Sequence, residues 1–463
     1  MSGIDTRAAR PVPARVHLVG IGGVGMAGVA RLLLLRGHKV SGSDLRDGRI
    51  IEELRALGAT VNIGHDASVV DSVDQVIIST AVPRTNPEVA AALAAGIEVV
   101  LRARALADAL SADTSVLIAG THGKTTTTAM TVVGLQQAGV DPSFVIGGQL
   151  NETGANAHAG ADAIAIAEAD EADRSFLMYE PDVAVITNVE LDHPDEFSDT
   201  ADVEEAFVSF LQRLRPGGTA ILCADDAGSA ALVDRVPHEA RVVTYGTHAD
   251  ATVRLVIEGP GRATVHTPEC TVALTLQLPG DHNLRNAAAS LAIARALGQD
   301  VPATAVGLGI FQGTQRRFQR LGTVGGVEVI DDYAHHPTEL AATLDAARSQ
   351  TDGRIVVVVQ PHRYSRTRVL GAELGRAAAA ADLVVVTEVY AGPEQPEPGV
   401  TGQLVADAAT AAGAEVVFEP HLGALADVLA ERVRDGDVVL ITGAGDVTRV
   451  GPALLDRLRT RRA

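Results

Sequence analysis

Short apolar runs alternate with longer amphipathic stretches rich in Ala and Leu along almost the whole chain. Such runs occur, for example, at residues 15–19, 115–119 and 355–359, and a helix-like stretch follows each of them. Parallel strands are buried on both faces and are connected by helices, so they produce this alternation. The pattern therefore predicts an α/β fold with mainly parallel sheets.

The alternation restarts twice, which divides the chain into three units. Because 463 residues exceed a single typical core, several domains are expected. We predict three consecutive αβ domains, 1–111, 112–318 and 319–463. The stretch 252–278 alternates more regularly and predicts a small antiparallel excursion. The expected strands are 15–19, 39–43, 75–79, 97–101, 115–119, 161–167, 183–187, 220–223, 241–245, 327–330, 355–359, 383–387, 415–418 and 438–442, and the expected long helices are 124–138 and 283–297.

The charge balance and the cysteine content exclude several classes of protein. The 38 basic and 58 acidic residues give a net charge of −20, which argues against a general nucleic-acid binder, because such proteins need a basic face. Cys223 and Cys270 lack metal-ligand spacing and exclude a disulfide framework. The sequence shows neither a signal-like segment nor an apolar run of membrane-spanning length. We expect a cytoplasmic protein without membrane insertion, as a monomer or weak homodimer.

The first of two glycine-rich loops is Gly20-Ile21-Gly22-Gly23-Val24-Gly25, between an expected strand and an expected helix. It fits the dinucleotide fingerprint, in which glycines let the backbone approach a diphosphate and the helix N-terminus supplies N–H donors. Asp44 ends the next strand, where such folds contact a ribose. The loop predicts a Rossmann-like first domain with a diphosphate-bearing ligand. NAD, FAD and UDP-sugars all satisfy it, and a tight turn that binds nothing is the alternative.

The second loop, Gly120-Thr121-His122-Gly123-Lys124-Thr125-Thr126, ends as a P-loop ends. Its backbone N–H groups can surround phosphates, Lys124 can neutralise β/γ oxygens and the Thr125 hydroxyl can hold Mg²⁺. The loop is shorter than the general form, because Ile118 occupies the position of the first glycine. We therefore predict a central P-loop-type ATPase domain, followed by a third, Rossmann-like domain. Two nucleotide loops in consecutive domains favour a ligase that joins a nucleotide-linked substrate to another group at the expense of ATP.

The order of several sequence segments along the chain narrows this class of ligase further. Along nearly its whole length the chain resembles the Mur ligase family, on segments that occur in the family's order, at 120–126, 168–173, 188–193, 280–287, 331–337 and 362–368. The last two segments, and the glycine-rich start at 20–28, are similar to those of the alanine-adding members. Two departures are Ala172, where Ser is common, and Pro194, where Met is common. No clear match exists for the modified lysine of other Mur ligases, which agrees with the alanine-adding branch.

The resemblance implies an ATP-dependent reaction that joins L-alanine to the carboxylate of UDP-N-acetylmuramate through an acyl phosphate, in peptidoglycan precursor synthesis. ADP and phosphate are the expected products, and ATP and Mg²⁺ are the expected co-substrate and cofactor. Glu168 and His193 are expected to hold a second Mg²⁺, while Thr125 serves the first. Because the sites fall on all three domains, catalysis is expected to require closure of the third domain.

The resemblance also assigns the remaining site residues. Asn283 and Asn286 are expected near the adenine, although helix capping is the usual reason for Asn at a helix start. Residues expected to reach ATP from either side of the second boundary are Arg317 and Asp332. His335, Arg363 and Arg366 follow strands of the third domain and are candidates for binding the alanine carboxylate and the acyl intermediate, since the guanidinium fork matches a carboxylate. Asp44 and Ser79 are our candidates for the UDP end.

Three alternative functions remain at this stage. A recycling ligase that attaches a preformed tripeptide to the same UDP-sugar would share the first two domains. A NAD-binding dehydrogenase rests on the loop at 20–25 alone. A non-catalytic nucleotide sensor would not need the acidic segments at 168–173 and 188–193.

Overall fold

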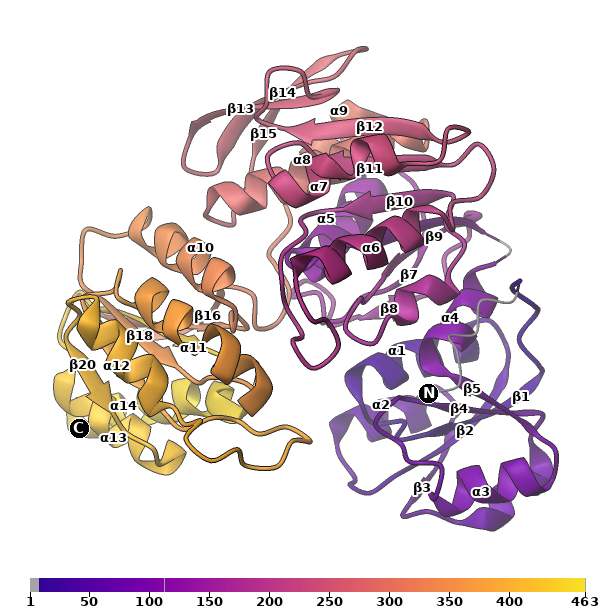
Figure 1. Cartoon of the computed structure of the whole chain (residues 1–463), viewed down its shortest axis with the longest axis horizontal. Helices are drawn as coiled ribbons and strands as arrows, with labels where there is room; N and C mark the ends of the chain where they lie inside the picture. Colours follow the sequence, from indigo (N-terminus) through magenta and orange to yellow (C-terminus); the bar gives the residue numbers. More distant parts are fainter. Residues whose placement is uncertain (1–7, 112, 463) are drawn as a thin grey trace.

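The computed structural model describes residues 8–111 and 113–462, which form three sheets that follow one another along the chain (Figure 1). Most strand pairs within each sheet are parallel, and helices connect them. The predicted α/β fold with mainly parallel sheets is therefore confirmed. Among the described residues, no helix combines the length and the apolar character needed to cross a membrane.

The first sheet has the strand order β3-β2-β1-β4-β5, and all of its pairs are parallel. This is the order of a Rossmann-like sheet. The edge strand β3 was not expected, because only Val61 in it is buried and it has no continuous apolar run. The elements are β1 (Arg15–Val19), α1 (Val24–Leu35), β2 (Lys39–Asp44), α2 (Arg49–Ala56), β3 (Thr60–Ile63), η1 (Ala67–Ser72), β4 (Gln75–Ile78), α3 (Pro87–Ala94), β5 (Glu98–Leu101) and α4 (Arg102–Leu110).

The central sheet places β6, the strand before the second glycine loop, between β9 and β10, and both of these pairs are parallel. The ten strands have the order β15-β14-β13-β12-β11-β10-β6-β9-β7-β8. The expected antiparallel excursion is confirmed as β13–β15, which extends this sheet beyond β12. The elements are β6 (Thr114–Ala119), α5 (Lys124–Gln137), β7 (Ser143–Val145), β8 (Ala157–His158), β9 (Ile164–Glu168), η2 (Ser175–Met178), β10 (Val183–Ile186), α6 (Thr200–Leu211), β11 (Thr219–Cys223), α7 (Ala227–Ala231), η3 (Val233–Arg235), β12 (Arg241–Gly246), β13 (Val253–Gly259), β14 (Arg262–His266), β15 (Thr271–Thr275), α8 (Asp281–Ala296) and α9 (Val301–Leu308).

The third sheet has the order β16-β17-β21-β18-β19-β20 and is parallel except for the edge pair β16–β17. The sequence did not indicate β16, because none of its residues is fully buried. The elements are β16 (Gln319–Val324), β17 (Val327–Asp332), α10 (Pro337–Arg348), β18 (Ile355–Val359), α11 (Tyr364–Ala378), β19 (Leu383–Val386), α12 (Gln403–Ala411), β20 (Val416–Phe418), η4 (Leu422–Ala424), α13 (Leu425–Arg432), β21 (Val438–Thr442), η5 (Asp446–Arg449) and α14 (Val450–Arg462).

The first and central units share one continuous apolar core. A single cluster joins Leu32 of α1 and Leu106 of α4 to Phe176 and Phe207 of the central unit. The third unit instead has its own clusters on the two faces of its sheet, represented by Leu340 on α10. In Figure 1 the third unit, in orange and yellow, lies beside the other two. The third unit is therefore attached by contacts other than a shared apolar core.

A buried carboxylate connects the loops at the end of the first sheet. The side chain of Glu88, on α3, is fully buried and accepts hydrogen bonds from Ser43 Oγ at 2.6 Å and from the Asp66 N–H at 3.1 Å. His65 Nδ1 lies 3.0 Å and His17 Nε2 lies 3.7 Å from its carboxylate. Burial would raise the pKa of Glu88, but these neighbours outweigh burial and lower it to about 2.

Replacing Glu88 by Gln should remove a stabilising charge whose effect depends on pH. The pKa is lower in the folded chain than the ordinary 4.5, so the stabilisation is present above about pH 4.5 and is lost as the pH falls toward 2. We expect Glu88→Gln to lower the free energy of unfolding by about 2–3 kcal/mol at pH 7 and by much less at pH 3. Urea unfolding at both pH values measures this, with the exposed Glu52→Gln as the matched control. An equal loss at both pH values would contradict the assignment.

Candidate functional site

The second glycine loop lies at the carboxyl end of β6, between the ends of β9 and β10. Gly120 (φ +129°) leaves no room for a side chain, because a Cβ there would lie 2.0 Å from Thr187 Oγ1. At Gly123 (φ +82°) a Cβ would lie 2.9 Å from Asn286 Oδ1. The loop is also fixed by the His122 N–H, which donates to Asn188 Oδ1 at 2.7 Å. Both glycines are therefore required by close approach of neighbouring groups.

Lys124 begins helix α5 and is held by a buried carboxylate. Its Nζ donates to Gly120 O at 2.6 Å and to both carboxylate oxygens of Glu171, at 2.8 and 3.0 Å. Burial would lower the pKa of Lys124, but the carboxylates of Glu171 and Asp170 raise it, so the ammonium group stays charged. The side chain of Glu171 is only 2% exposed, and burial raises its pKa.

Thr125 and Glu168 face each other beside this lysine. The Thr125 hydroxyl donates to Glu168 Oε2 at 3.0 Å, and the Gly147 N–H donates to Glu168 Oε1 at 2.6 Å. Burial raises the pKa of Glu168, although these hydrogen bonds and Lys124 oppose the rise. The structure thus brings together two of the three predicted metal ligands. Such a hydroxyl and a carboxylate are oxygen ligands of the kind that Mg²⁺ prefers.

A cavity of about 800 Å³ lies in front of the loop and is lined by residues of all three units. Val24 and Arg31 come from α1, and Arg31 is also hydrogen-bonded to Asn156 of the central unit at 2.6 Å. The predicted site residues in the lining are Thr121, His122, Gly123, Lys124, Thr125, Glu168, His193, Arg317, His335, Arg363 and Arg366.

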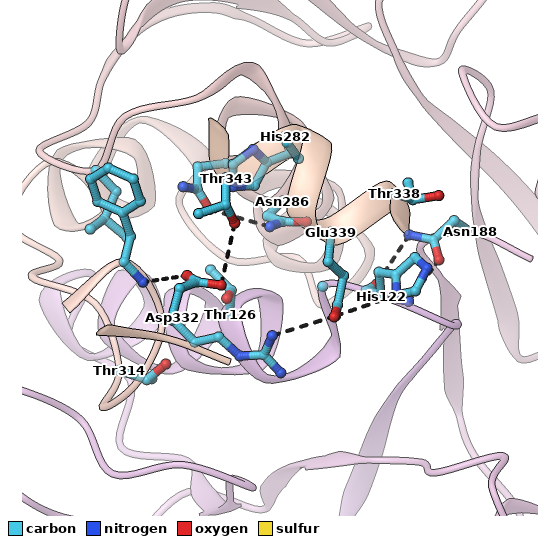
Figure 2. A pocket seen from close by; sticks show the side chains of 16 residues that line it. His122, Thr126, Asn188, His282, Asn286, Thr314, Asp332, Thr338, Glu339 and Thr343 are labelled. Carbon is cyan, nitrogen blue, oxygen red and sulfur yellow. Dashed lines mark hydrogen bonds and ion pairs between the residues drawn. The ribbon is translucent and has the colours of Figure 1, made fainter. Parts of the chain in front are cut away.

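A smaller cavity of about 150 Å³ lies on the other side of the loop (Figure 2). His122, Gly123, Arg317 and Glu339 line both cavities, so the two adjoin at the phosphate loop. The two residues predicted on the adenine side, Asn283 and Asn286, line the smaller cavity. Thr126 and Asp332 line it as well.

The structure contradicts helix capping as the reason for these asparagines. Helix α8 begins at Asp281 after Gly280, so neither Asn is the N-cap residue. Asn283 Nδ2 donates to Pro279 O at 2.7 Å, and Asn286 Nδ2 lies 3.5 Å from Asn283 Oδ1. Both side chains are buried at the cavity wall.

The third unit contributes a histidine and two arginines that contact the segment after β10. Arg366 Nε donates to Asp192 Oδ1 at 2.6 Å, with both side chains nearly buried. Arg363 pairs with Asp195 at 2.8 Å, and His335 Nε2 lies 4.0 Å from Asp192 Oδ2. Burial lowers the pKa of His335 to about 4, so its ring is neutral at pH 7. The predicted cluster of His335, Arg363 and Arg366 therefore lies on one cavity wall.

His193 lines the same cavity but faces a cation. An Arg366 nitrogen lies 3.5 Å from the imidazole, and burial lowers the pKa of His193.

Asp332 lies at the smaller cavity, where its carboxylate accepts from the Phe318 N–H at 2.7 Å and the Ala334 N–H at 2.8 Å. Burial raises the pKa of Asp332 to about 6. Asp332 thus fixes the chain at the beginning of the third unit.

The residues predicted for the UDP end are less closely grouped. Gly20, Gly22, Gly23 and Gly25 form the turn before α1, and Asp44 Oδ2 accepts from the Gly22 N–H at 2.9 Å. The Asp44 carboxylate therefore braces the loop. Ser79 follows β4 and is half-buried, and its carbonyl accepts from the Val82 N–H at 3.1 Å. Neither Asp44 nor Ser79 lines the large cavity.

Sequence reasoning missed the acidic partners of the predicted cations. These are Glu171 beside Lys124, Asp192 beside Arg366, and Glu339 beside Arg317 at 3.5 Å. Glu171 and Asp192 lie inside the two recognised acidic segments, so their position was a usable signal. Glu339 lies in the first turn of α10, where an acidic residue normally only complements the helix dipole.

A P-loop at the meeting point of three α/β units defines a multidomain nucleotide-binding protein. Family models match each unit in turn: "Mur ligase family, catalytic domain" at residues 15–114, "Mur ligase middle domain" at 118–294 and "Mur ligase, glutamate ligase domain" at 316–445. The chain belongs to the Mur ligase family. The predicted resemblance is confirmed, and the dehydrogenase and nucleotide-sensor alternatives are wrong.

Relatives with similar sequences are ligases by name. The chain is 47% identical to the UDP-N-acetylmuramate–L-alanine ligase of Mycolicibacterium smegmatis, over 97% of this chain and 96% of that protein. It is 48% identical to the ligase of the same name from Acidothermus cellulolyticus, over 96% and 95% of the two chains. Among solved structures, the UDP-N-acetylmuramate-alanine ligase of Thermotoga maritima matches with a TM-score of 0.79 and 29% identity, over 96% of this chain and 99% of that one.

Replacing Glu171 by Gln should strengthen nucleotide binding. The change keeps the side-chain shape but removes a negative charge 2.8 Å from the Lys124 ammonium, for which phosphate oxygens compete. We expect ADP to bind about tenfold more tightly to the variant. Calorimetric titration with ADP and Mg²⁺ measures this, with the exposed Glu239→Gln of the same unit as control. Unchanged or weaker ADP binding would show that Glu171 does not compete with phosphate.

Proposed function

We propose that the protein ligates L-alanine to the carboxylate of UDP-N-acetylmuramate, consuming ATP and releasing ADP and phosphate in peptidoglycan precursor synthesis. The observation that carries the proposal is the cavity of about 800 Å³, in which the phosphate loop and Glu168 of the central unit face the same space as Arg363 and Arg366 of the third unit. The names of relatives at 47–48% identity over nearly full length support the same reaction.

The adjoining cavities suggest how ATP lies. Asn283 and Asn286 line the small cavity, which we assign to the adenine, and the phosphates then pass Gly123 and reach Lys124 in the large cavity. Backbone N–H groups of residues 120–126 and the start of α5 favour the negative phosphates. Arg317 lines both cavities and is placed to contact the nucleotide between them.

A carboxylate needs a leaving group before an amine can displace oxygen from it. In the proposed reaction the muramoyl carboxylate attacks the γ-phosphorus, ADP leaves, and the amine then attacks the acyl phosphate and expels phosphate. Phosphoryl transfer depends on positioning and on cations around the transferring group, and Lys124 supplies one of these cations. Residues of all three units line the space in which this chemistry would take place.

We propose Mg²⁺ as the cofactor, with Thr125 and Glu168 as the residues that would hold it and His193 as a further candidate. Thr125 Oγ1 and Glu168 Oε2 lie 3.0 Å apart, and the buried acid needs a cationic partner, so the donor set fits a divalent cation. Bound there, Mg²⁺ would neutralise charge on phosphate oxygens. The fit of His193 is poorer, because Arg366 lies 3.5 Å from its ring.

We assign the alanine carboxylate to the wall that carries Arg363 and Arg366. Arg366 is already paired with Asp192 at 2.6 Å, whereas the Arg363 side chain is 27% exposed and pairs with the more exposed Asp195. Arg363 is therefore the better candidate for a direct contact, and Arg366 for holding the wall together. His335 is neutral and is placed to orient the amine.

The remaining parts of the proposal concern the first unit and the organisation of the chain. We assign the UDP diphosphate to the loop at 20–25, with Asp44 bracing the loop through Gly22. Domain boundaries near residues 111 and 318 and closure of the third domain stay predictions. We also propose a cytoplasmic location, which the free thiols Cys223 and Cys270 and the use of ATP support.

The recycling ligase is the nearest alternative. A UDP-N-acetylmuramate:L-alanyl-γ-D-glutamyl-meso-diaminopimelate ligase from Neisseria meningitidis matches with 27% identity and a TM-score of 0.60, over 67% of this chain and 100% of that one. The alanine ligases are far more similar in sequence and cover nearly the whole chain. The single-amino-acid reaction is therefore the better supported function.

The reaction is tested by ADP formation with UDP-N-acetylmuramate and a series of amines. We expect L-alanine to give the highest kcat/KM, with glycine lower by about 10–200-fold because one methyl group is lost. The preformed tripeptide should give no turnover. Absence of alanine-dependent ADP formation, or preference for the tripeptide, would overturn the proposal.

The assignment of the ATP site has its own test. Lys124→Ala should lower alanine-dependent ADP formation at least about a thousandfold, because a cation at the transferring phosphoryl group is lost. Circular dichroism and thermal unfolding should stay close to those of the unchanged protein. Retained turnover by a folded Lys124→Ala variant would disprove the assignment.

A further inference from the structure

One carboxylate, Glu339, lies where the two cavities meet. It comes from the first turn of α10 in the third unit, its side chain is 11% exposed, and it lines both cavities. Figure 2 shows it pointing toward His122, and a guanidinium nitrogen of Arg317 lies 3.5 Å from its carboxylate. A group in this position can act on the nucleotide side and on the amine side together.

Glu339 contacts three predicted site residues from different parts of the chain. Its Oε1 lies 3.3 Å from Nδ1 of His122 in the phosphate loop and 3.5 Å from a guanidinium nitrogen of Arg317. Its Oε2 accepts from the His335 N–H at 3.1 Å and lies 3.3 Å from His335 Nδ1. The contacts thus join the phosphate loop, the segment between the second and third units, and the amine side of the cavity.

His122 is the central partner, because it lies between two carboxylates. Its Nε2 lies 3.5 Å from Glu190 Oε2 in the central unit, on the side opposite Glu339. Burial would lower the pKa of His122, but Glu190 and Glu339 outweigh it and raise the pKa to about 9. Burial would likewise raise the pKa of Glu339, but the charged partners His122 and Arg317 keep it well below its usual range. Both partners are therefore charged at neutral pH.

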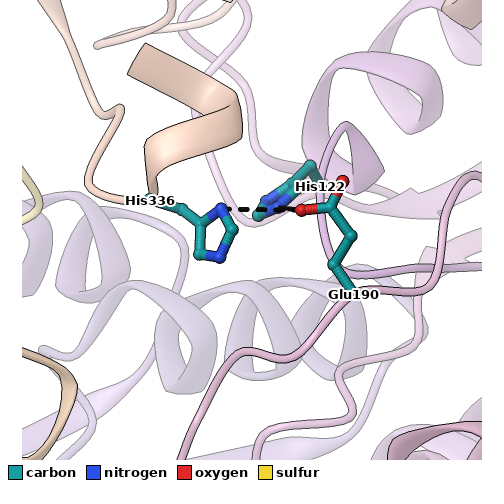
Figure 3. Close-up of side chains that lie close together, drawn as sticks. All are labelled: His122, Glu190 and His336. Carbon is teal, nitrogen blue, oxygen red and sulfur yellow. Dashed lines mark ion pairs between the residues drawn. The ribbon is translucent and has the colours of Figure 1, made fainter. Parts of the chain in front are cut away.

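A metal site is the other chemical explanation for this cluster. His122, Glu190 and His336 place ligand atoms within 4.8 Å of one another (Figure 3). However, His336 Nδ1 already accepts from the Thr338 N–H at 3.3 Å, and its Nε2 faces Leu191 O at 3.3 Å. Glu190 Oε2 also accepts from Thr338 Oγ1 at 2.6 Å. These bonds use the atoms that a metal would need, so ion pairing explains the cluster better.

We propose that Glu339 is a positioning residue for the ligation, which holds His122, Arg317 and His335 so that the ATP site and the amine site form together. The third unit has its own apolar core, so its placement against the phosphate loop depends on polar contacts such as these. Without the carboxylate, His122 keeps Glu190 as its acidic partner, and His335 keeps Tyr333 O at 3.0 Å from its Nδ1 but loses the bond from its backbone N–H. The amine side would then be misplaced relative to the acyl phosphate.

The kinetic test compares Glu339→Gln with Asp345→Asn, an exposed acid on the same helix. For Glu339→Gln we expect kcat/KM for L-alanine to fall about 100-fold, while the KM for ATP changes less than about threefold. Glu339→Asp should recover part of the loss, and Asp345→Asn should behave as wild type. Wild-type kinetics in Glu339→Gln, or a loss confined to the KM for ATP, would overturn the proposal.

A double-mutant cycle tests the contact itself. If Glu339 acts through His122, the double variant His122→Asn with Glu339→Gln should have a kcat/KM only slightly below that of the less active single variant. Effects that multiply would contradict the link. Because a misfolded variant would also lose activity, thermal unfolding of each protein is measured, and a variant that unfolds early is replaced by Glu339→Asp in the cycle.

A readout without alanine separates this inference from the proposed function on which it rests. In a pH titration of the His122 ring signals by NMR, the midpoint should fall by at least about one pH unit in Glu339→Gln. An unchanged midpoint would overturn the inference even if the ligation is correct. If the midpoint shifts but the protein forms no ADP with alanine, the contact between Glu339 and His122 is supported and the proposed ligation of L-alanine is disproved.

Discussion

Parallel pairing of β9, β6 and β10 determines where the chemistry of this protein lies. In this register Ile118 pairs with Glu168 on one side, and Ala119 pairs with Ile186 on the other, so the three strands end at the same level. The phosphate loop and the two acidic segments must then meet at one edge of the sheet. The bond between Thr125 and Glu168 and the pair between Lys124 and Glu171 follow from this register.

The segment after β10 has a second task, because the third unit is docked on it. Arg366 binds Asp192, Arg363 binds Asp195 and Thr338 donates to Glu190, all within residues 190–195. The first two units are instead joined by a continuous apolar core. Polar contacts between units can be exchanged for water or ligand at modest cost, whereas an apolar core cannot be opened cheaply. The arrangement is therefore suited to a third unit that moves relative to the other two.

The sequence predicted the fold where strands are buried on both faces. The central strands of each sheet appear as continuous apolar runs, and these were found within one or two residues of their observed positions, except that β9 begins three residues later than expected. The edge strands β3 and β16 have mixed burial and carry no such run. Continuous apolar runs thus indicate strands that are buried on both faces, and regular alternation indicates strands buried on one face, such as β15.

The sequence motifs predicted which residues line the candidate site, but they did not predict which acidic side chains pair with its cations. Loops that follow adjacent parallel strands must meet, so Thr125, Glu168 and His193 were expected together and line one cavity. The partners of the cations were not expected, since Arg366 and Asp192 are 174 positions apart and only the packing of two units joins them. The assignment of Asp44 to the UDP end stays a prediction, and its carboxylate accepts a hydrogen bond from the Gly22 N–H. Long-range electrostatic pairing leaves no periodic signal in a sequence.

Backbone geometry at the junction shows how strongly the surroundings determine these side chains. Non-glycine residues with positive φ include His193 (57°), Arg316 (61°), Phe318 (49°) and Arg363 (65°), all at the junction of the central and third units. Each such conformation costs on the order of 1 kcal/mol and persists only where neighbouring contacts compensate. The Arg363 N–H is held by Tyr390 O at 2.8 Å, and the Phe318 N–H by Asp332 at 2.7 Å. Both bonds lie within the third unit, so this unit itself compensates the strain and presents Arg363 and Phe318 at the junction with the central unit.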